Sequence, residues 1–261
     1  MCDSWNTIAG HRQQFEQFAE EWLALHPAPM LQLKREHTYA VLEHAQNIVR
    51  QEKIGGEQGR AALLAALYHD VGRFPQYATW KTFSDAHSKN HGLLGVQLIK
   101  RSGFLKDESL PVQRLVLAAV GMHNRYCLPA ALPPEVRLVT QVVRDADKLD
   151  IMRIMARYLN ETVPSEDVVL HVRNEPEGWS QRIVDTILSG KIPGYTELEY
   201  VNDFRMLLGS WLRDLHFRTA RLSFLHSGWL EAVLNGLPQK EPFTAVCTYL
   251  YAVRDRILHD L

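Results

Sequence analysis

The sequence contains few cysteines and no segment that resembles a targeting signal. Its three cysteines, Cys2, Cys127 and Cys247, lie far apart and form no Cys-x-x-Cys pair. An odd and sparse set of cysteines in a chain of 261 residues predicts reduced thiols and a cytoplasmic protein rather than a disulfide scaffold. The N-terminal residues also lack the basic and then apolar pattern of a secretory signal.

Long apolar runs and an excess of one charge are absent as well. No run approaches 18 apolar residues, so the sequence predicts no membrane span. The 29 Lys and Arg residues nearly balance the 30 Asp and Glu residues, which disfavours a broad electrostatic contact with nucleic acid or an anionic membrane. We therefore expect no stable nucleic-acid or membrane partner, while the oligomeric state stays open. The 46% apolar content is typical of a globular protein.

The hydrophobic periodicity predicts an all-α fold. Apolar residues recur at spacings of three and four, and no alternating strand pattern extends beyond a few residues. The helices are expected over the ranges 11–26, 36–52, 57–70, 90–102, 112–123, 134–157, 179–189, 198–226 and 242–257. We expect an N-terminal helix over 1–33, a helical core over 34–160 and a C-terminal helical cap over 161–261, all within one compact domain.

Histidine is abundant, with twelve in the chain, and several lie on apolar helix faces. Six titratable residues on five predicted helices occupy positions where apolar side chains are expected: His37, His69, Asp70, His91, His123 and Asp145. The remaining histidines are expected at the surface or in ordinary packing, and the role of His87, four residues before His91, stays open.

These six side chains require compensation if they are buried. One histidine or aspartate on an apolar face is more often a satisfied core residue than a ligand. Burying an unpaired imidazole costs about 1–3 kcal/mol, and burying a lone carboxylate costs several kcal/mol even after relaxation. One or two divalent ions would compensate all six together. Imidazole and carboxylate donors without thiolate suit Mn, Fe, Ni, Co or Zn.

The order of these residues resembles the HD-domain metal-dependent phosphohydrolase superfamily. His37, the pair His69-Asp70 in ALYHDVGRF and Asp145 in RDADKLD match its ligand pattern. His91 in NHGLLG and His123 in GMHNRY are similar to two further histidines of its two-metal members. The resemblance spans about residues 34–150 and implies an HD-type helical bundle with these six residues as metal ligands. In the segment 195–230, DFRMLLGSWLRDLHF resembles a subfamily of uncharacterised bacterial HD proteins.

The sequence departs from the better-known members of that superfamily. Val71-Gly72-Arg73-Phe74 stands where alarmone hydrolases carry a Glu-Asp pair. The Gly-Tyr-Pro signature and the tandem histidines of cyclic-di-GMP phosphodiesterases are missing, and deoxynucleoside triphosphate hydrolases are longer. The substrates of these groups therefore do not transfer to this chain.

Cations close to the expected ligands indicate an anionic substrate. Arg73 lies three residues after Asp70, and Lys148 three after Asp145. Fixed positive donors near a metal suit a phosphoryl group, so we expect Asp70, Arg73 and Lys148 to be catalytic. The alternative is that Arg73 and Lys148 pair with nearby carboxylates, namely Asp85, Asp147 and Asp150. Of these, Asp147 and Asp150 are expected to be solvated or to support ligands rather than to be ligands.

The expected function is metal-dependent hydrolysis of a phosphate ester by a metal-activated water. Its substrate would be a nucleotide or another small phosphorylated metabolite, bound in a pocket with walls from about 74–90 and 160–225. Two alternatives stay open. The same ligands can hold two irons in an HD-type oxygenase, and a metal-dependent pocket can sense a nucleotide without converting it.

Overall fold

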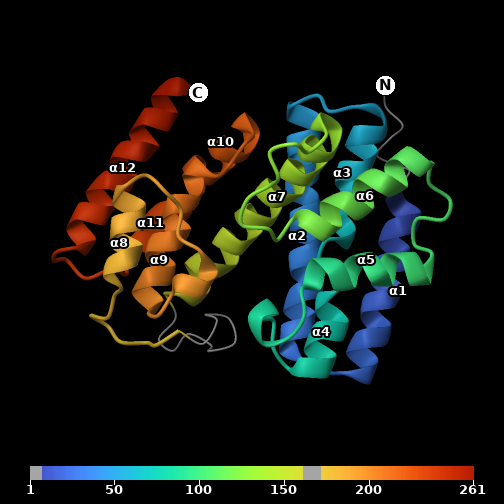
Figure 1. Cartoon of the computed structure of the whole chain (residues 1–261), viewed down its shortest axis with the longest axis horizontal. Helices are drawn as coiled ribbons and strands as arrows, with labels where there is room; N and C mark the ends of the chain where they lie inside the picture. Colours follow the sequence, from blue (N-terminus) through green and yellow to red (C-terminus); the bar gives the residue numbers. More distant parts are fainter. Residues whose placement is uncertain (1–7, 161–171) are drawn as a thin grey trace. The chain divides into compact units, whose positions relative to one another are not determined.

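The structure, a computed structural model, describes residues 8–160 and 172–261 and confirms the all-α prediction (Figure 1). Within those residues the β structure is limited to one isolated bridge between Arg173 and Tyr200. Cys2 and His171 lie outside the described residues. In the described part of the chain, no helix has both the length and the apolar character needed to cross a membrane.

The chain divides into two compact units, Met1–Asp150 and Ile151–Leu261. The first unit contains six complete helices and most of a seventh, which are α1 (Ala9–Leu25), α2 (Pro29–Gln51), α3 (Gly56–Tyr68), α4 (Arg73–Trp80), α5 (His91–Ser102), α6 (Leu110–Met122) and α7 (Pro134–Tyr158). The expected arrangement of helix, core and cap within one domain stays a prediction.

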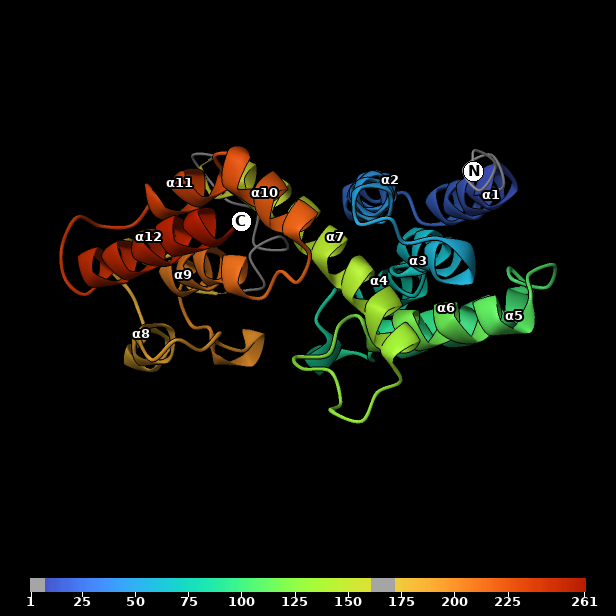
Figure 2. The ribbon, with the colours of Figure 1, turned by 90° about the horizontal axis from the view of Figure 1, so that it is seen from above.

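Helix α3 is the centre of the first unit. It packs against α2 and α6, and Figure 2 shows it between them. Its sequence is dense in alanine and leucine, and the continuous stretch Ala61–Tyr68 is fully buried. Small alanine side chains let both neighbours approach closely while the leucines fill the space between them. The buried end of this helix is where His69 and Asp70 follow.

Glycines bring α5 against the turn that follows α3. A Cβ added to Gly72 would lie 2.1 Å from the carbonyl oxygen of His91 and 2.6 Å from the amide nitrogen of Gly95. A Cβ on Gly92 would lie 2.8 Å from the carbonyl oxygen of Val120 on α6. These positions leave no room for any larger residue, because the backbones themselves are in contact. The contact places His91 beside the His69-Asp70 turn.

Local caps fix where α5 begins and ends. The Asn90 side chain accepts a hydrogen bond of 3.0 Å from the backbone N–H of Leu93, so the helix starts at His91. Gly103 ends it with a left-handed φ of 64°. The Asn90 cap therefore fixes the start of α5 locally, and the first residue of the helix, His91, is one of the predicted ligands.

Several element boundaries differ from the sequence prediction. Helix α2 begins at Pro29 rather than at residue 36, because proline fits the first turn of a helix. Helix α4 and α11 (Trp229–Leu234) were not predicted, since both are short. The apolar stripe over 198–226 is divided into α9 (Val201–Ser210), a 3₁₀ turn and α10 (Arg218–His226).

The second unit is built around α9. Helices α8 (Gln181–Leu188), α11 and α12 (Phe243–Asp260) pack against it, and all ten of its residues are buried. Its polar residues have partners: Asp203 accepts hydrogen bonds from the Ser180 hydroxyl and backbone, and Arg205 donates to the carbonyl oxygens of Leu159 and Val233. These bonds satisfy groups that would otherwise be costly to bury.

Candidate metal centre

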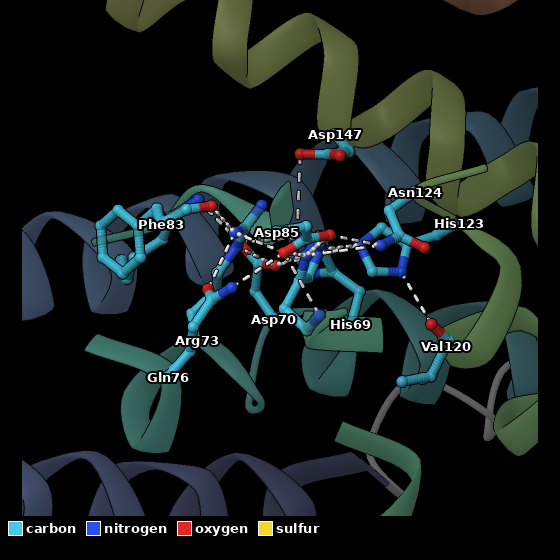
Figure 3. Close-up of polar contacts among 12 residues, drawn as sticks. His69, Asp70, Arg73, Gln76, Phe83, Asp85, Val120, His123, Asn124 and Asp147 are labelled. Atoms are coloured by element: carbon cyan, nitrogen blue, oxygen red, sulfur yellow. Dashed lines mark hydrogen bonds and ion pairs between the residues drawn. The ribbon is translucent and has the colours of Figure 1, made fainter. Parts of the chain in front are cut away.

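Five helices of the first unit deliver a cluster of histidine and aspartate side chains to one place (Figure 3). The cluster contains residues from α2, from the turn after α3, from the start of α5, from the end of α6 and from α7: His37, His69, Asp70, His91, His123 and Asp147. All are buried except Asp147, whose side chain is 19% exposed.

Three overlapping groups within this cluster could each hold a metal ion. One consists of His37, His69 and Asp70, a second of Asp70, His91 and His123, and a third of His69, His123 and Asp147. In each group, the potential ligand atoms all lie within 4.8 Å of one another. Asp70 is the one residue that the first and second groups share, so its carboxylate links these two groups.

The two oxygens of Asp70 face different pairs of imidazoles. Its Oδ2 lies 3.7 Å from Nε2 of His37 and 3.6 Å from Nε2 of His69. Its Oδ1 lies 3.4 Å from Nε2 of His91 and 3.9 Å from Nε2 of His123. One carboxylate oxygen and two imidazole nitrogens thus meet on each side of Asp70. This is an arrangement in which a carboxylate can bridge two ions.

Hydrogen bonds to backbone carbonyls fix the tautomers of two of these histidines. Nδ1–H of His69 donates to the carbonyl oxygen of Ala66 at 2.8 Å, and Nδ1–H of His123 donates to that of Val120 at 2.8 Å. Because a carbonyl oxygen only accepts, Nδ1 must carry the proton. In neutral imidazoles the lone pair is then on Nε2, the atom that points into the cluster.

Carboxylates hold the other two imidazoles in the same orientation. Nδ1–H of His37 donates to Asp150 at 2.6 Å, and Nδ1–H of His91 donates to Asp85 at 2.8 Å. A histidine ligand that donates its second ring N–H to a carboxylate or carbonyl is typical of metal sites, where this bond orients the ring and raises its basicity.

The Nε2 atoms crowd one another. Those of His91 and His123 are 3.0 Å apart, and those of His37 and His69 are 3.4 Å apart. Two lone pairs that face each other cannot form a hydrogen bond and repel. A divalent cation that accepts both lone pairs removes this conflict, so the donor set fits a metal of the kind that binds imidazole and carboxylate.

The pKa values agree with neutral imidazoles for three of the four histidines. Burial lowers the pKa of His91 and of His123 to about 4, and burial also lowers the pKa of His69. Burial acts in the same direction on His37, but hydrogen bonds to its two carboxylate partners outweigh it and raise the pKa. His37 therefore binds a proton more strongly than the other three histidines.

The aspartate of α7 that reaches the cluster is Asp147, whereas the sequence prediction named Asp145. Oδ1 of Asp147 lies 3.1 Å from Nε2 of His37 and 3.7 Å from Nε2 of His69. Asp145 is buried but belongs to none of the three groups. Two residues along a helix correspond to a rotation of about 200°, so the two carboxylates lie on opposite faces. Asp150 shares the face of Asp147 and supports His37.

Arg73 contacts the cluster from the first turn of α4. Its Nε lies 3.4 Å from Oδ1 of Asp70, and its Nη1 donates to Gln76 at 2.9 Å and lies 3.4 Å from Asp85. Arg73 thus lies beside Asp70 and also pairs with Asp85, the alternative that the sequence left open, while its expected catalytic role stays a prediction. Within the described residues, the buried Nε has no hydrogen-bond partner.

Asp85 connects Arg73 to the histidines. It precedes α5 in a short 3₁₀ turn, Asp85–His87, and its oxygens accept hydrogen bonds from Gln76, His91 and Asn124 (Figure 3). Asn124 follows His123, so the carboxylate joins the start of α5 to the end of α6. His87, at the end of the same turn, is exposed.

Lys34 is a member of the site that the sequence did not reveal. Its Nζ lies 2.7 Å from Oδ2 of Asp70, and its side chain is only 16% exposed. The sequence feature that could have indicated Lys34 is its position three residues before His37, which places both side chains on one face of α2. Lys148 is half-buried on α7, and its expected catalytic role stays a prediction.

Comparison with protein families gives a match to the HD domain over residues 35–152. Neither the curated proteins nor the solved structures contain a match to the chain. The matched range includes every histidine and aspartate of the cluster. Residues 35–152 of this chain are therefore an HD domain.

Proposed function

We propose that this chain is a metal-dependent hydrolase of a phosphate ester, which would be a nucleotide or another small phosphorylated metabolite. The observation that carries the proposal is the convergence of four imidazole Nε2 atoms on the two oxygens of Asp70. The family supports it, because HD-domain proteins are mostly metal-dependent phosphohydrolases.

The described residues offer ligands for one or two ions. His37, His69, Asp70 and Asp147 would hold the first, and His91 and His123 would hold a second with the other oxygen of Asp70. The donor types suit Mn, Fe, Ni, Co or Zn. A bound ion would supply a water of lowered pKa as nucleophile and polarise a phosphoryl oxygen.

The residues around the ligands would prepare the site for this chemistry. Asp85 and Asp150 hold the Nδ1 protons of His91 and His37 and so keep Nε2 available as the ligand atom. Arg73 presents a positive charge beside Asp70, where it would bind the phosphoryl oxygens and stabilise charge that develops on them.

A panel of phosphatase and phosphodiesterase substrates, assayed with Mn, Co, Ni, Mg and Fe, tests the proposal. Hydrolysis should require added metal and should be abolished in a variant that lacks both His69 and Asp70. Two other results would replace it. Oxygen uptake by the anaerobically prepared iron protein would indicate an oxygenase, and metal-dependent nucleotide binding without turnover would indicate a sensor.

A further inference from the structure

Two cations approach Asp70 from opposite sides of its carboxylate. Nζ of Lys34 lies 2.7 Å from Oδ2, and Nε of Arg73 lies 3.4 Å from Oδ1. Both side chains are 16% exposed, so each reaches from the cluster towards solvent. They come from different helices, α2 and α4, and two helices therefore bring positive charge to one carboxylate.

The two cations also share one aromatic ring. Phe83 lies in the segment between α4 and the 3₁₀ turn, with its ring centroid 5.4 Å from Nζ of Lys34 and 5.5 Å from Cζ of Arg73. Figure 3 shows the ring beside Arg73. Cations near an aromatic face are attracted by it, and the half-buried ring limits the positions that both charged groups can take.

Both cations keep hydrogen-bonding capacity beyond their contacts with Asp70. An ammonium group has three donors, and among the described residues Asp70 takes one from Lys34. The buried Nε of Arg73 has no hydrogen-bond partner in that part of the chain. Asp85, the second carboxylate that faces Arg73, also accepts hydrogen bonds from three other side chains, so its negative charge is shared among several donors.

We propose that Lys34 and Arg73 together bind the phosphate group of the substrate, and that this pair selects a phosphate monoester. The proposal rests on the hydrolase function proposed above. A metal that takes Asp70 as a ligand would compete with both cations for its oxygens and make their donors available. The ammonium and guanidinium donors made available in this way are of the kind that bind phosphate oxygens.

The preference for a monoester follows from charge and oxygen count. A monoester has three terminal oxygens and carries up to two negative charges, whereas a diester has two terminal oxygens and one charge. Two cations with several donors each therefore gain more from the monoester. Lys34 would act as a specificity-determining residue, and its loss should affect monoesters more than diesters.

The experiment compares Lys34→Met, Lys34→Arg and the control Lys100→Met, which changes an exposed lysine on α5. Three quantities are measured on each metal-loaded protein: metal content, the affinity for inorganic phosphate by calorimetry, and kcat/KM for p-nitrophenyl phosphate and for bis(p-nitrophenyl) phosphate. Lys34→Met should keep its metal, bind phosphate at least about tenfold more weakly and lose about 10²-fold in kcat/KM for the monoester. The diester should change much less, Lys34→Arg should restore most of the phosphate affinity, and the control should match the parent.

Two results would overturn the inference. Unchanged phosphate affinity in a metal-loaded Lys34→Met variant would remove Lys34 from the substrate site. Lys34→Met could instead lose its metal or its fold, and a folded Lys34→Arg variant could fail to recover phosphate affinity. These two results together would make Lys34 a structural partner of Asp70.

The inference and the proposed function fail differently. If the parent protein hydrolyses neither ester but binds phosphate through Lys34, the cation pair stands and the hydrolase proposal fails. If it prefers the diester, or hydrolyses the monoester equally well without Lys34, the hydrolase proposal stands and this inference fails.

Discussion

His91 and His123 point their Nε2 atoms at each other across 3.0 Å, while each donates its Nδ1 proton away from the cluster. The arrangement leaves two lone pairs in contact unless a cation lies between the rings or one ring gains a proton. Burial lowers the pKa of both histidines to about 4, so protonation is disfavoured at neutral pH. The pair is therefore the part of the cluster that most directly predicts a second ion.

Asp85 should control that second ion. Its carboxylate orients His91 by accepting the hydrogen bond from Nδ1–H. It also accepts hydrogen bonds from Gln76 and Asn124, rather than from His37 or His69. Asp85→Asn should lower the affinity for the second ion by about 10- to 100-fold, as is usual when the hydrogen-bond partner of a metal ligand is changed. The first ion should remain bound. Metal titration followed by mass spectrometry measures both. Asp107→Asn, at an exposed position, is the control, and equal weakening of both ions would show that Asp85 acts on the whole fold.

Asp147 rather than Asp145 should be needed for the first ion. The carboxylate of Asp147 lies within 3.1 Å of Nε2 of His37, so Asp147→Asn should lower metal affinity by at least about tenfold. Asp145→Asn should leave metal content unchanged in the folded protein. Metal analysis of both variants after dialysis gives the comparison, and loss of metal in Asp145→Asn alone would restore the sequence-based assignment.

Arg73 should matter for turnover and not for metal binding. Arg73→Ala removes a cation beside Asp70 and should reduce kcat/KM for a phosphate ester by about 10²-fold. Metal content should remain that of the parent protein, and Arg101→Ala, at an exposed position of α5, should behave like the parent. Full activity in Arg73→Ala would exclude Arg73 from the substrate site.

Gly72 should be intolerant of any side chain. Its Cβ would lie 2.1 Å from the carbonyl oxygen of His91, and relief requires the α5 backbone to move. Gly72→Ala should destabilise the fold by about 1–3 kcal/mol or more, as overpacking does, and should also displace His91. Thermal unfolding of the metal-free protein measures the effect. Gly10→Ala in α1 has open space around its Cβ and should be neutral or stabilising.

The sequence predicted the cluster because polar residues interrupted apolar helix faces. His37, His69, His91 and His123 are buried where periodicity placed them, and the end of the Ala- and Leu-rich helix gave the position of Asp70. Helix type and order followed from the same patterns. These features depend on local periodicity and on burial, which a sequence displays directly.

Other features of the site depended on relationships that periodicity does not contain. The segment RDADKLD carries three aspartates within six residues, and the rotation of α7 about its axis, which the packing of the helix sets, decides which of them face the cluster. Lys34 reads as an ordinary solvated residue until Asp70 is placed beside it. Asp85 lies in a short turn between helices, where no repeating pattern indicates the direction of its side chain.

The most direct test of the account is the metal content of a variant in which His69 and Asp70 are both replaced by alanine. Asp70 faces all four imidazoles, and His69 contributes one of them, so the variant should bind no ion tightly at either position. Circular dichroism should show that the variant remains helical. Bound metal should fall from one or two ions per chain in the parent to none, and unchanged stoichiometry in the folded variant would contradict the account.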